Sequence, residues 1–535
     1  TPMKLFQQLL VAPAALGLLA PLAVEATKPA NATELNINGV SDYAASSEQV
    51  TSITQFSDVY PTDWAYQALS NLIERYGCVA GYPNGTYRGQ RAMTRFEAAA
   101  LLNACLDRVT EVTDELKRLI KEFEKELAIL KGRVDGLEAR VGELEATQFS
   151  TTTKLKGQVT FVMGASTAGG SESSANDTYN QDLGAFTFNY DYRLELLTSF
   201  TGKDLLKTRL RAGNFGNSVF GTGLTAMEVA FEESSGANSV GIDRLFYQFP
   251  VGEDFTVTAG GRVRQDDMLA VWPSAYPSDT ILDFFTYAGA PGAYNLTLGS
   301  GAGVWWQKDG FSISANYVSA NGNLSSSEKG VGGGIATDAA ASNGTVQLAY
   351  AKDSWGLAAA YNYASGDNGA GVYGGNATPF SVDVSGAGVS NSVGLSAWWT
   401  PETAGWIPSI STGWGLNSVD GLDTTPIKSA TSQSWYVGLQ WADVFLKGNA
   451  AGMAVGQPTF VTSIDYRDSN ESDFVADGNY AFEWWYMFQV TDNISVTPAL
   501  FYLSRPLGEG TRQLNRDGDA TFNNFGGLVK TTFKF

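Results

Sequence analysis

The sequence predicts a mainly β protein: a sixteen-stranded antiparallel transmembrane β-barrel preceded by a small helical domain and a coiled-coil helix. Three observations support this fold class. The 59 glycines and the 12% of aromatic residues are typical of strands and turns. From Thr153 onward, apolar residues alternate with polar ones, which is the period of a half-buried strand. After the N-terminus no segment has 18 consecutive apolar residues, so a membrane crossing would have to use strands.

The composition excludes several functional classes. Over 535 residues, 55 acidic and 35 basic side chains give a formal net charge of −20. This charge argues against a nucleic-acid partner, because binding to phosphates needs a basic face. Histidine is absent, which excludes Ser/His/Asp catalysis, a His-ligated zinc and a haem with a proximal histidine. We therefore expect neither an enzyme nor a cofactor, and we assign no catalytic or metal-ligating residues.

Residues 1–26 have the features of a secretory signal peptide. Lys4 is followed by an apolar stretch over residues 9–22, and the segment ends at small residues around Ala26. A disordered hydrophobic N-terminus is the alternative. Residues 27–52 are rich in Ser, Thr, Asn and Ala without a period, and this composition predicts a flexible linker.

Residues 53–106 predict a small helical domain. A helical pattern begins at Asp63, and Thr94 with Glu97 forms a capping box at the start of a second helix. Between the two helices, residues 81–88 contain a Pro-Asn-Gly turn.

The chain has two cysteines, Cys78 and Cys105, and both lie in this helical region. An exported protein meets an oxidising compartment, where a disulfide between them would form. The alternative is that both are small buried side chains.

The helical region resembles the S-layer homology (SLH) domain. The matching motifs are, in order, Phe56-Ser57-Asp58-Val59, Trp64-Ala65, Gly81-Tyr82-Pro83-Asn84-Gly85-Thr86-Tyr87-Arg88 and Thr94-Arg95-Phe96-Glu97. Phe96 stands where the family usually has alanine. SLH domains bind cell-wall polysaccharide, so the resemblance implies a wall-binding site that includes Trp64, Gly81 and Arg95. Arg95 would meet an anionic or polyhydroxy group, and Trp64 would shape the groove. The alternative is structural: Arg95 pairs with a local carboxylate and Trp64 lies in the core.

Residues 107–148 predict a coiled-coil periplasmic stalk. Residues 107–145 hold 11 acidic and 8 basic side chains, and apolar residues recur at spacings of three and four with one stutter after Phe123. So polar a helix needs partner helices to bury its apolar stripe, which predicts an oligomer. A single helix packed on the barrel is the alternative.

Residues 154–535 predict the barrel. In the clearest strand, residues 186–196, the large apolar side chains lie on one face and Asp191, Arg193 and Glu195 on the other. In a membrane barrel the apolar face meets lipid and the charged face lines water. Seven short and eight long connections give sixteen strands, with fourteen or eighteen as alternatives. The predicted long connections include residues 214–240, 265–301 and 417–432.

The chain ends with the alternating segment 528–535, whose last residue is Phe535. This segment resembles the C-terminal signal of bacterial outer-membrane proteins. With its N-terminal domain, the chain resembles the SLH-containing porins of cyanobacterial outer membranes, in the carbohydrate-selective porin family. The resemblance implies an outer-membrane barrel with the N-terminal domain in the periplasm. Its implied partners are outer-membrane lipid, peptidoglycan or another wall polysaccharide, and two further copies of the chain, because porin barrels commonly trimerise.

The resemblance also implies a constricted pore. In general porins the loop after the fifth strand folds inward and narrows the channel, which here would be residues 265–301. If apolar residues such as Val263 face lipid, alternation places a basic row on the lumen side of three strands: Lys207, Arg209, Arg211, Arg244, Arg262 and Arg264. The loop would oppose this row with Asp266, Asp267, Asp279 and Asp283. Opposed charges across a narrow channel select small ions and polar solutes. The alternative is that the arginines only form salt bridges within the wall.

These observations favour a passive diffusion porin for small hydrophilic solutes and inorganic ions, tethered to peptidoglycan. One alternative is a structural protein that joins the outer membrane to the wall through a closed barrel. Another is a sugar-selective porin, for which Trp485 is an inward-facing aromatic residue.

Overall fold

The structure is a computed structural model that describes residues 52–63, 66–71, 73–74, 86–87, 121–122, 124–125, 152–278, 281–468 and 473–535. The chain divides into two units, residues 1–148 and 149–535, and each is described by itself. The predicted signal peptide and most of the predicted coiled coil lie outside the described residues. So do six predicted functional residues: Trp64, Cys78, Gly81, Arg95, Cys105 and Asp279.

In the first unit, the described residues of the SLH-like region form a small apolar cluster. Its elements are the 3-10 helix η1 (Ile53–Gln55), which the Ser52 hydroxyl caps, and the helix α4 (Tyr66–Asn71). The buried members of the cluster are Ile53, Phe56, Leu69 and Ile73. The backbone N–H of Tyr87 donates to the Asp58 carboxylate at 2.6 Å, so two motifs that are distant in sequence meet here.

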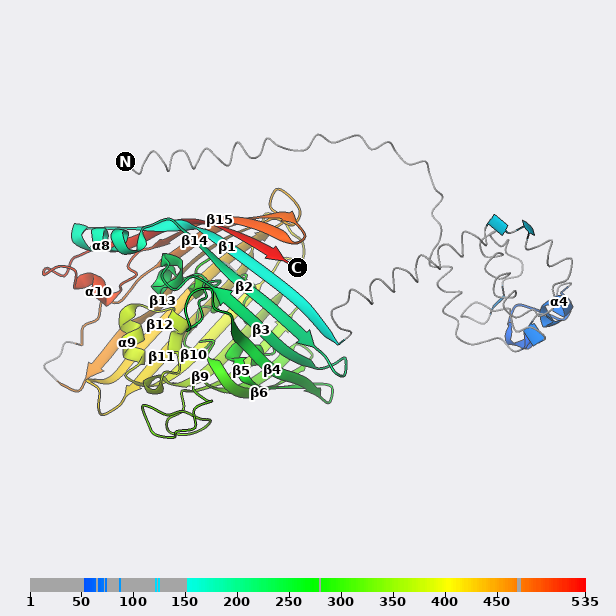
Figure 1. Cartoon of the computed structure of the whole chain (residues 1–535), viewed down its shortest axis with the longest axis horizontal. Helices are drawn as coiled ribbons and strands as arrows, with labels where there is room; N and C mark the ends of the chain where they lie inside the picture. Colours follow the sequence, from blue (N-terminus) through cyan, green and yellow to red (C-terminus); the bar gives the residue numbers. More distant parts are fainter. Residues whose placement is uncertain are drawn as a thin grey trace. The chain divides into compact units, whose positions relative to one another are not determined.

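The second unit is a closed barrel of sixteen antiparallel strands (Figure 1). Each strand pairs with its neighbours in sequence, and the first strand pairs with the last, which confirms the predicted strand number. The strands are β1 (Thr153–Gly170), β2 (Thr187–Thr198), β3 (Leu205–Gly213), β4 (Gly241–Val251), β5 (Phe255–Arg264), β6 (Leu298–Lys308), β7 (Phe311–Ser319), β8 (Ser342–Lys352), β9 (Trp355–Ser365), β10 (Gly388–Trp399), β11 (Ser409–Gly421), β12 (Ile427–Ala442), β13 (Ala450–Tyr466), β14 (Ala481–Thr491), β15 (Ile494–Leu503) and β16 (Phe522–Lys534).

The connections carry short helices. The α-helices are α8 (Ser173–Leu183), α9 (Pro379–Ser385) and α10 (Glu509–Arg512), and the 3-10 helices are η3 (Val219–Gly221), η4 (Gly223–Thr225), η5 (Gln265–Met268), η6 (Asp283–Thr286), η7 (Gly366–Asn368) and η8 (Val372–Gly375). Among the described residues, no helix combines the length and the apolarity that a membrane crossing requires.

The seam between β1 and β16 closes the barrel. The two strands pair without interruption from Gln158–Lys534 to Gly170–Phe522. At the end of the seam, Phe535 and Gly157 exchange backbone hydrogen bonds of 3.0 and 2.7 Å. A Cβ atom at Gly157 would lie 2.2 Å from the Phe535 ring, so the approach of the terminal aromatic residue requires glycine there. The last residue of the chain thus takes part in the closure.

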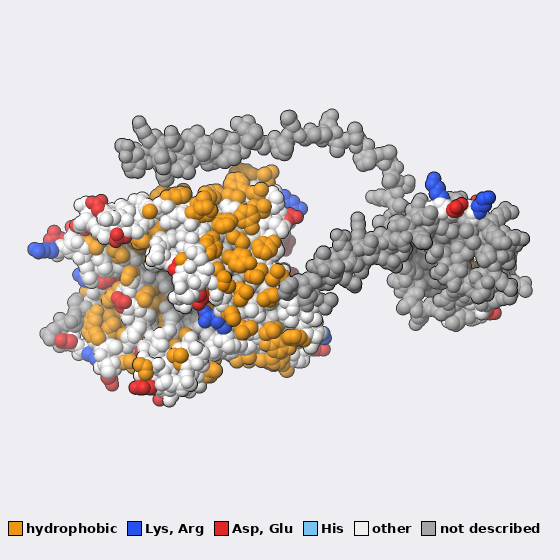
Figure 2. Space-filling model, in the orientation of Figure 1, with side chains coloured by type: hydrophobic (Ala, Val, Ile, Leu, Met, Phe, Trp, Pro, Cys, Tyr) orange, Lys and Arg blue, Asp and Glu red, His pale blue; other side chains and the backbone are white. Residues whose placement is uncertain are grey.

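The predicted alternation separates the two faces of the wall. On β9, Trp355, Leu357 and Tyr361 are exposed, whereas Ala358 and Asn362 are buried. The same pattern places Phe188 outward on β2 and the charged residues of that strand inward. Figure 2 shows patches of apolar side chains over the barrel wall on the face in view, as expected of a lipid-facing wall.

Strands β11 and β12 extend farther than the sequence predicted. The predicted long connection 417–432 reduces to residues 422–426, so that prediction is wrong. The polar Ser418 and Asp420 occupy the exposed face of β11 near its end. The apolar alternation therefore ends before the strand does, and a pattern of hydrophobicity could not locate the true end.

Gly526 and Gly527 are adjacent on β16, so a Cβ atom added at each would meet the packing on opposite faces of the wall. A Cβ atom at Gly526 would lie 2.1 Å from the ring of Phe501, which is fully buried, whereas the nearest atom at Gly527 is the end of the Leu500 side chain, at 3.2 Å. We expect Gly526→Ala to destabilise the barrel by about 1–3 kcal/mol through overpacking, and Gly527→Ala to have a much smaller effect. The measurement is the temperature at which each purified variant loses the electrophoretic mobility of the folded barrel. Equal temperatures would contradict the inward packing of Phe501.

Candidate pore constriction

The connection between β5 and β6, residues 265–297, folds into the barrel. The Gln265 side chain donates a hydrogen bond to Thr345 of β8 at 2.7 Å, and the N–H of Tyr276 donates to Ser411 of β11 at 2.9 Å. Both acceptors are buried on the inner side of the wall. The connection therefore crosses the lumen.

Glu483 of β14 holds the far side of this connection. Its two carboxyl oxygens accept hydrogen bonds from the Tyr276 hydroxyl at 2.7 Å and from the N–H of Leu282 at 2.8 Å. The indole N–H of Trp485 donates to the same Tyr276 hydroxyl at 2.9 Å. Glu483 has no exposed surface, so its carboxyl group depends on these partners.

A second connection, residues 214–240 between β3 and β4, also enters the lumen, which the sequence analysis missed. Its backbone pairs with the first inward connection: Met227 and Leu282 form an antiparallel bridge, and the N–H of Asp283 donates to the carbonyl of Ala226 at 3.0 Å. Six of its apolar side chains are buried: Phe215, Val219, Phe220, Leu224, Met227 and Val229. The large number of apolar residues in this connection is the sequence feature that indicates its burial.

A third connection, residues 366–387 between β9 and β10, packs beside the other two. The Asn376 amide donates to the Asp283 carboxylate at 2.8 Å, and the hydroxyls of Tyr373 and Ser432 share a hydrogen bond of 2.9 Å. Apolar side chains of the first two connections, among them Phe284 and Phe285, form a cluster inside the barrel. Wall residues such as Tyr436, Phe501 and Leu528 complete this cluster. We call this cluster the lumenal core.

The basic residues predicted on β3 pair with carboxylates of the same wall. The ion pairs are Lys207–Glu195 (3.1 Å), Arg209–Glu195, Arg209–Asp243 (3.3 Å) and Arg211–Asp191 (2.7 Å). Arg193 of β2 adds pairs with Asp191 (2.6 Å) and with Glu228 of the second inward connection (3.4 Å). These carboxylates were not among the predicted site residues.

The other predicted basic residues lie near the start of the first inward connection. Arg244 pairs with Asp267 at 2.6 Å, and Arg264 pairs with Asp266. Arg262 makes no ion pair within the described ranges, and its Nε is buried without a hydrogen-bond partner there. Asp266 and Asp267 thus contact the basic wall directly and do not oppose it across open water.

Strict alternation fails in β5. A β-bulge interrupts the pairing between Gly260 and Val263. Val263, which was expected to face lipid, is fully buried and packs with Phe246, Met268 and Val318. The prediction for Val263 is therefore wrong, because the extra residue at the bulge turns the Val263 side chain to the inner face.

Asp283 lies among the inward connections and away from the basic side chains of β3. Burial raises the pKa of its carboxyl group to about 7, although the hydrogen bond from Asn376 acts in the opposite direction. At neutral pH, Asp283 therefore contributes less than a full negative charge to the lumen.

Part of the ion-paired wall remains in contact with water. Its members keep between 15% and 26% of the side chain exposed: Arg193, Glu195, Lys207, Arg209, Glu228, Arg264 and Asp266. We call these residues the charged strip. With the more deeply buried Asp191, Arg211, Asp243, Arg244 and Asp267, they form a network of six basic and six acidic side chains whose formal charges cancel.

Residues 111–535 match the family described as carbohydrate-selective porin, OprB family, and residues 55–99 match the S-layer homology domain. The chain belongs to the carbohydrate-selective porin family. It is an outer-membrane porin with an SLH domain, and its family and fold point to a transport channel rather than an enzyme. The family and the outer-membrane location predicted from the sequence are confirmed.

Several known proteins are similar to this porin. A protein of Nostoc sp. is 36% identical over 91% of this chain and 86% of its own length, and one of Synechocystis sp. is 32% identical over 97% and 100%. The outer membrane protein SlpA of Deinococcus radiodurans is 38% identical over 18% of this chain and 9% of its own length. A solved structure of Pseudomonas putida OprB is 12% identical and covers 74% of this chain and 96% of that chain, with a TM-score of 0.46.

Glu483 offers a test of the inward connection. Glu483→Ala leaves the Tyr276 hydroxyl and the Leu282 N–H without their acceptor, at a cost of about 1–3 kcal/mol for each buried group. We expect residues 265–297 to open more often, which would give larger and noisier single-channel currents and new protease cleavage within this segment. The control is Glu402→Ala in the exposed turn between β10 and β11, which should behave like the parent porin. Indistinguishable currents from the two variants would show that Glu483 does not hold the connection.

Proposed function

We propose that this porin allows passive diffusion of inorganic ions and other small hydrophilic solutes along the charged strip. The observation that carries the proposal is the partial exposure of this strip in a lumen otherwise crossed by apolar connections. Charges of both signs lie close together there, so local fields are strong but decay over a short distance. Such fields act on small ions and dipolar solutes, and the equal numbers of basic and acidic side chains in the whole ion-paired network give little preference for either sign of ion.

The lumenal aromatic residues support ions over sugars as solutes. Sugar recognition by stacking needs aromatic faces that the solute can reach. The aromatic members of the lumenal core are at most 1% exposed: Phe215, Phe220, Phe284, Phe285, Tyr436 and Phe501, with Tyr276 at 3% and Trp485 at 8% as the exceptions. Trp485, the aromatic residue proposed for a sugar path, is bound to Tyr276 beneath the inward connection.

A structural role with a closed barrel is the second candidate function. The lumenal core favours it, because it joins two inward connections to the inner face of β12–β16. In that case the protein would link outer membrane to wall without conducting. The two functions differ in a direct measurement, the current through a single molecule.

We expect the full-length protein in planar bilayers of outer-membrane lipid to give discrete current steps in potassium chloride. Proteoliposomes should swell readily in isosmotic urea or glycine and much more slowly in a disaccharide, because the passage lies beside a packed core. The lipid without protein is the control. An absence of current steps would establish the closed barrel, and faster swelling in the disaccharide than in urea or glycine would establish a sugar-selective pore.

We also propose that the chain is exported by residues 1–26 and tethered by its SLH domain to peptidoglycan or another wall polysaccharide. In this organisation, residues 27–52 form a linker, 53–106 the wall-binding domain, 107–148 a coiled-coil stalk and 154–535 the pore. A trimeric stalk would bring three wall-binding domains together. The match of residues 55–99 to the SLH family supports the tether.

The tether can be tested through Arg95. Arg95→Ala should reduce the amount of protein that pellets with purified cell walls, because a guanidinium group binds anionic and polyhydroxy groups through paired hydrogen bonds. Arg467→Ala, which changes an arginine beside an outer connection of the barrel, should pellet like the parent protein. Full pelleting of the Arg95 variant would remove this residue from the wall-binding site.

A further inference from the structure

We propose that Arg262 binds the phosphate group of a membrane lipid on the outer face of the barrel wall. Arg262 lies near the end of β5, next to the bulge that interrupts the strand pairing. Alternation alone predicts a lumenal position for this residue. The bulge separates it from the charged strip, so the proposed site is independent of the pore.

Strand pairing indicates which face Arg262 occupies. Its partner in register on β4 is Leu245, which is 40% exposed, and cross-strand partners share a face of the sheet. The next residue, Val263, is fully buried and packs against Met268 of the first inward connection. The extra residue of the bulge, Gly261, is exposed, and a Cβ atom there would have no neighbour within 4 Å. Arg262 therefore lies on the outer face, because a bulge re-aims the side chain beside it.

Arg262 has no partner within the part of the chain that the structure describes. It forms no ion pair there, and its buried Nε has no hydrogen-bond acceptor. A positive charge on a lipid-facing wall is unfavourable unless it reaches water or an anion. Because Arg262 is partly exposed, its terminal nitrogens are the donors for an anion from outside the chain. The other basic residues predicted for the pore all form ion pairs: Lys207, Arg209, Arg211, Arg244 and Arg264.

Its height on the wall places Arg262 near a headgroup layer. It lies seven residues after Phe255, with which β5 begins at the short-turn end. A rise of about 3.3 Å per residue and a strand tilt of about 40° place it roughly 17 Å above that end, in an apolar band about 25 Å tall. A long arginine side chain covers the remaining distance along the surface. Arg262 thus reaches the headgroups of the leaflet on the long-connection side.

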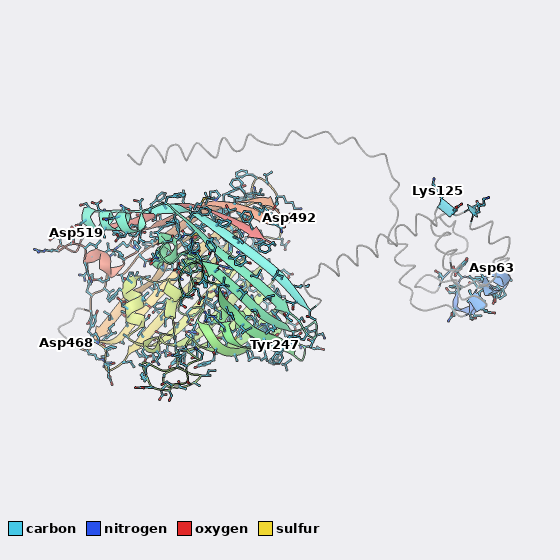
Figure 3. All side chains as sticks on the ribbon, in the orientation of Figure 1. Asp63, Lys125, Tyr247, Asp468, Asp492 and Asp519 are labelled. Carbon is cyan, nitrogen blue, oxygen red and sulfur yellow. The ribbon has the colours of Figure 1, made fainter. Side chains whose placement is uncertain are left out.

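The wall on the β4 side of Arg262 is apolar. Ile242 and Leu245 are 47% and 40% exposed. Tyr247, which Figure 3 labels, follows Leu245 on the same row of β4 toward the short turn. An acyl chain that lies against this row is therefore next to the arginine.

The connection between β7 and β8, residues 320–341, begins on the other side of the bulge. The Ser300 hydroxyl of β6 donates to the carbonyl of Gly261 at 3.2 Å, and a Cβ atom at Gly322 would lie 2.7 Å from the Ser300 side chain. The cation is thus bordered by apolar wall on one side and by this connection on the other. The connection exposes three apolar side chains, which are suited to contact with lipid: Leu324, Val331 and Ile335.

A cation bordered by apolar surface fits an amphiphile with an anionic headgroup. The guanidinium fork matches two phosphate oxygens and donates charge-assisted hydrogen bonds to both. A free inorganic anion would gain nothing from the apolar side chains, whereas a membrane lipid supplies both parts. The occupant is therefore a lipid, held by its phosphate at Arg262 and by its acyl chains on the wall. The site is continuous with the lipid-facing surface of the porin.

Native mass spectrometry of the full-length protein in detergent tests this site. The protein is mixed with phosphatidylglycerol or with a neutral galactosyl diacylglycerol that has the same acyl chains. We expect phosphatidylglycerol to bind in preference to the neutral lipid, and an excess of inorganic phosphate to leave it bound. Arg262→Gln should weaken phosphatidylglycerol binding about tenfold and leave binding of the neutral lipid unchanged, because it removes charge-assisted hydrogen bonds. Arg262→Lys should fall between the two, because lysine keeps the charge without the fork, and it carries the comparison if Arg262→Gln does not fold.

The matched control is Arg467→Gln. It removes an arginine of the long-connection rim that pairs with Asp423, so it should bind both lipids like the parent porin. Equal phosphatidylglycerol binding by the parent and the Arg262 variants, or displacement of the lipid by inorganic phosphate, would overturn the site. The same spectra report the number of protein copies. Loss of an oligomer in Arg262→Gln with lipid binding retained would also overturn it, because the partner would then be a carboxylate of a second copy.

Discussion

Closure of the sheet is the constraint on which the rest of this structure depends. Lipid offers no hydrogen-bond partner to the backbone, so a membrane-spanning sheet must leave no free edge. The β1–β16 seam meets this requirement, and Gly157 and Phe535 complete it with two backbone hydrogen bonds. Because the strand number is even, β1 begins and β16 ends at the same end of the barrel, where the short turns lie. The chain therefore enters and leaves the barrel on the periplasmic side.

A closed barrel of sixteen strands encloses more space than wall side chains can fill. Here the three inward connections supply the missing volume, and the inward polar residues of the wall receive them. Ser411 and Glu483 accept hydrogen bonds from connection backbone, and Thr345 accepts one from Gln265. Inward polar residues thus have two roles: some meet water, and others hold the connections that reduce the channel.

Features that repeat along the chain could be predicted from the sequence. Alternation gave the strand number and the lipid-facing side, and the terminal segment indicated the outer membrane. Local exceptions could not be predicted, because the bulge before Val263 leaves no periodic trace. Cross-strand pairs such as Arg211–Asp191 depend on register, which alternation alone does not fix. The apolar residues of 214–240 do carry a signal of burial, whereas the length of this segment alone is equally typical of an exposed outer loop.

The distribution of charge in the barrel explains why net charge cannot give the selectivity. Residues 154–535 carry 36 acidic and 21 basic side chains, yet the ion-paired network contains equal numbers of each. Because this network is balanced, the surplus of acidic groups lies outside it, in the short turns as well as in the outer connections. An ion crossing the barrel therefore meets regions of different sign in succession. The least favourable of these regions sets the barrier, because a solute must pass through all of them.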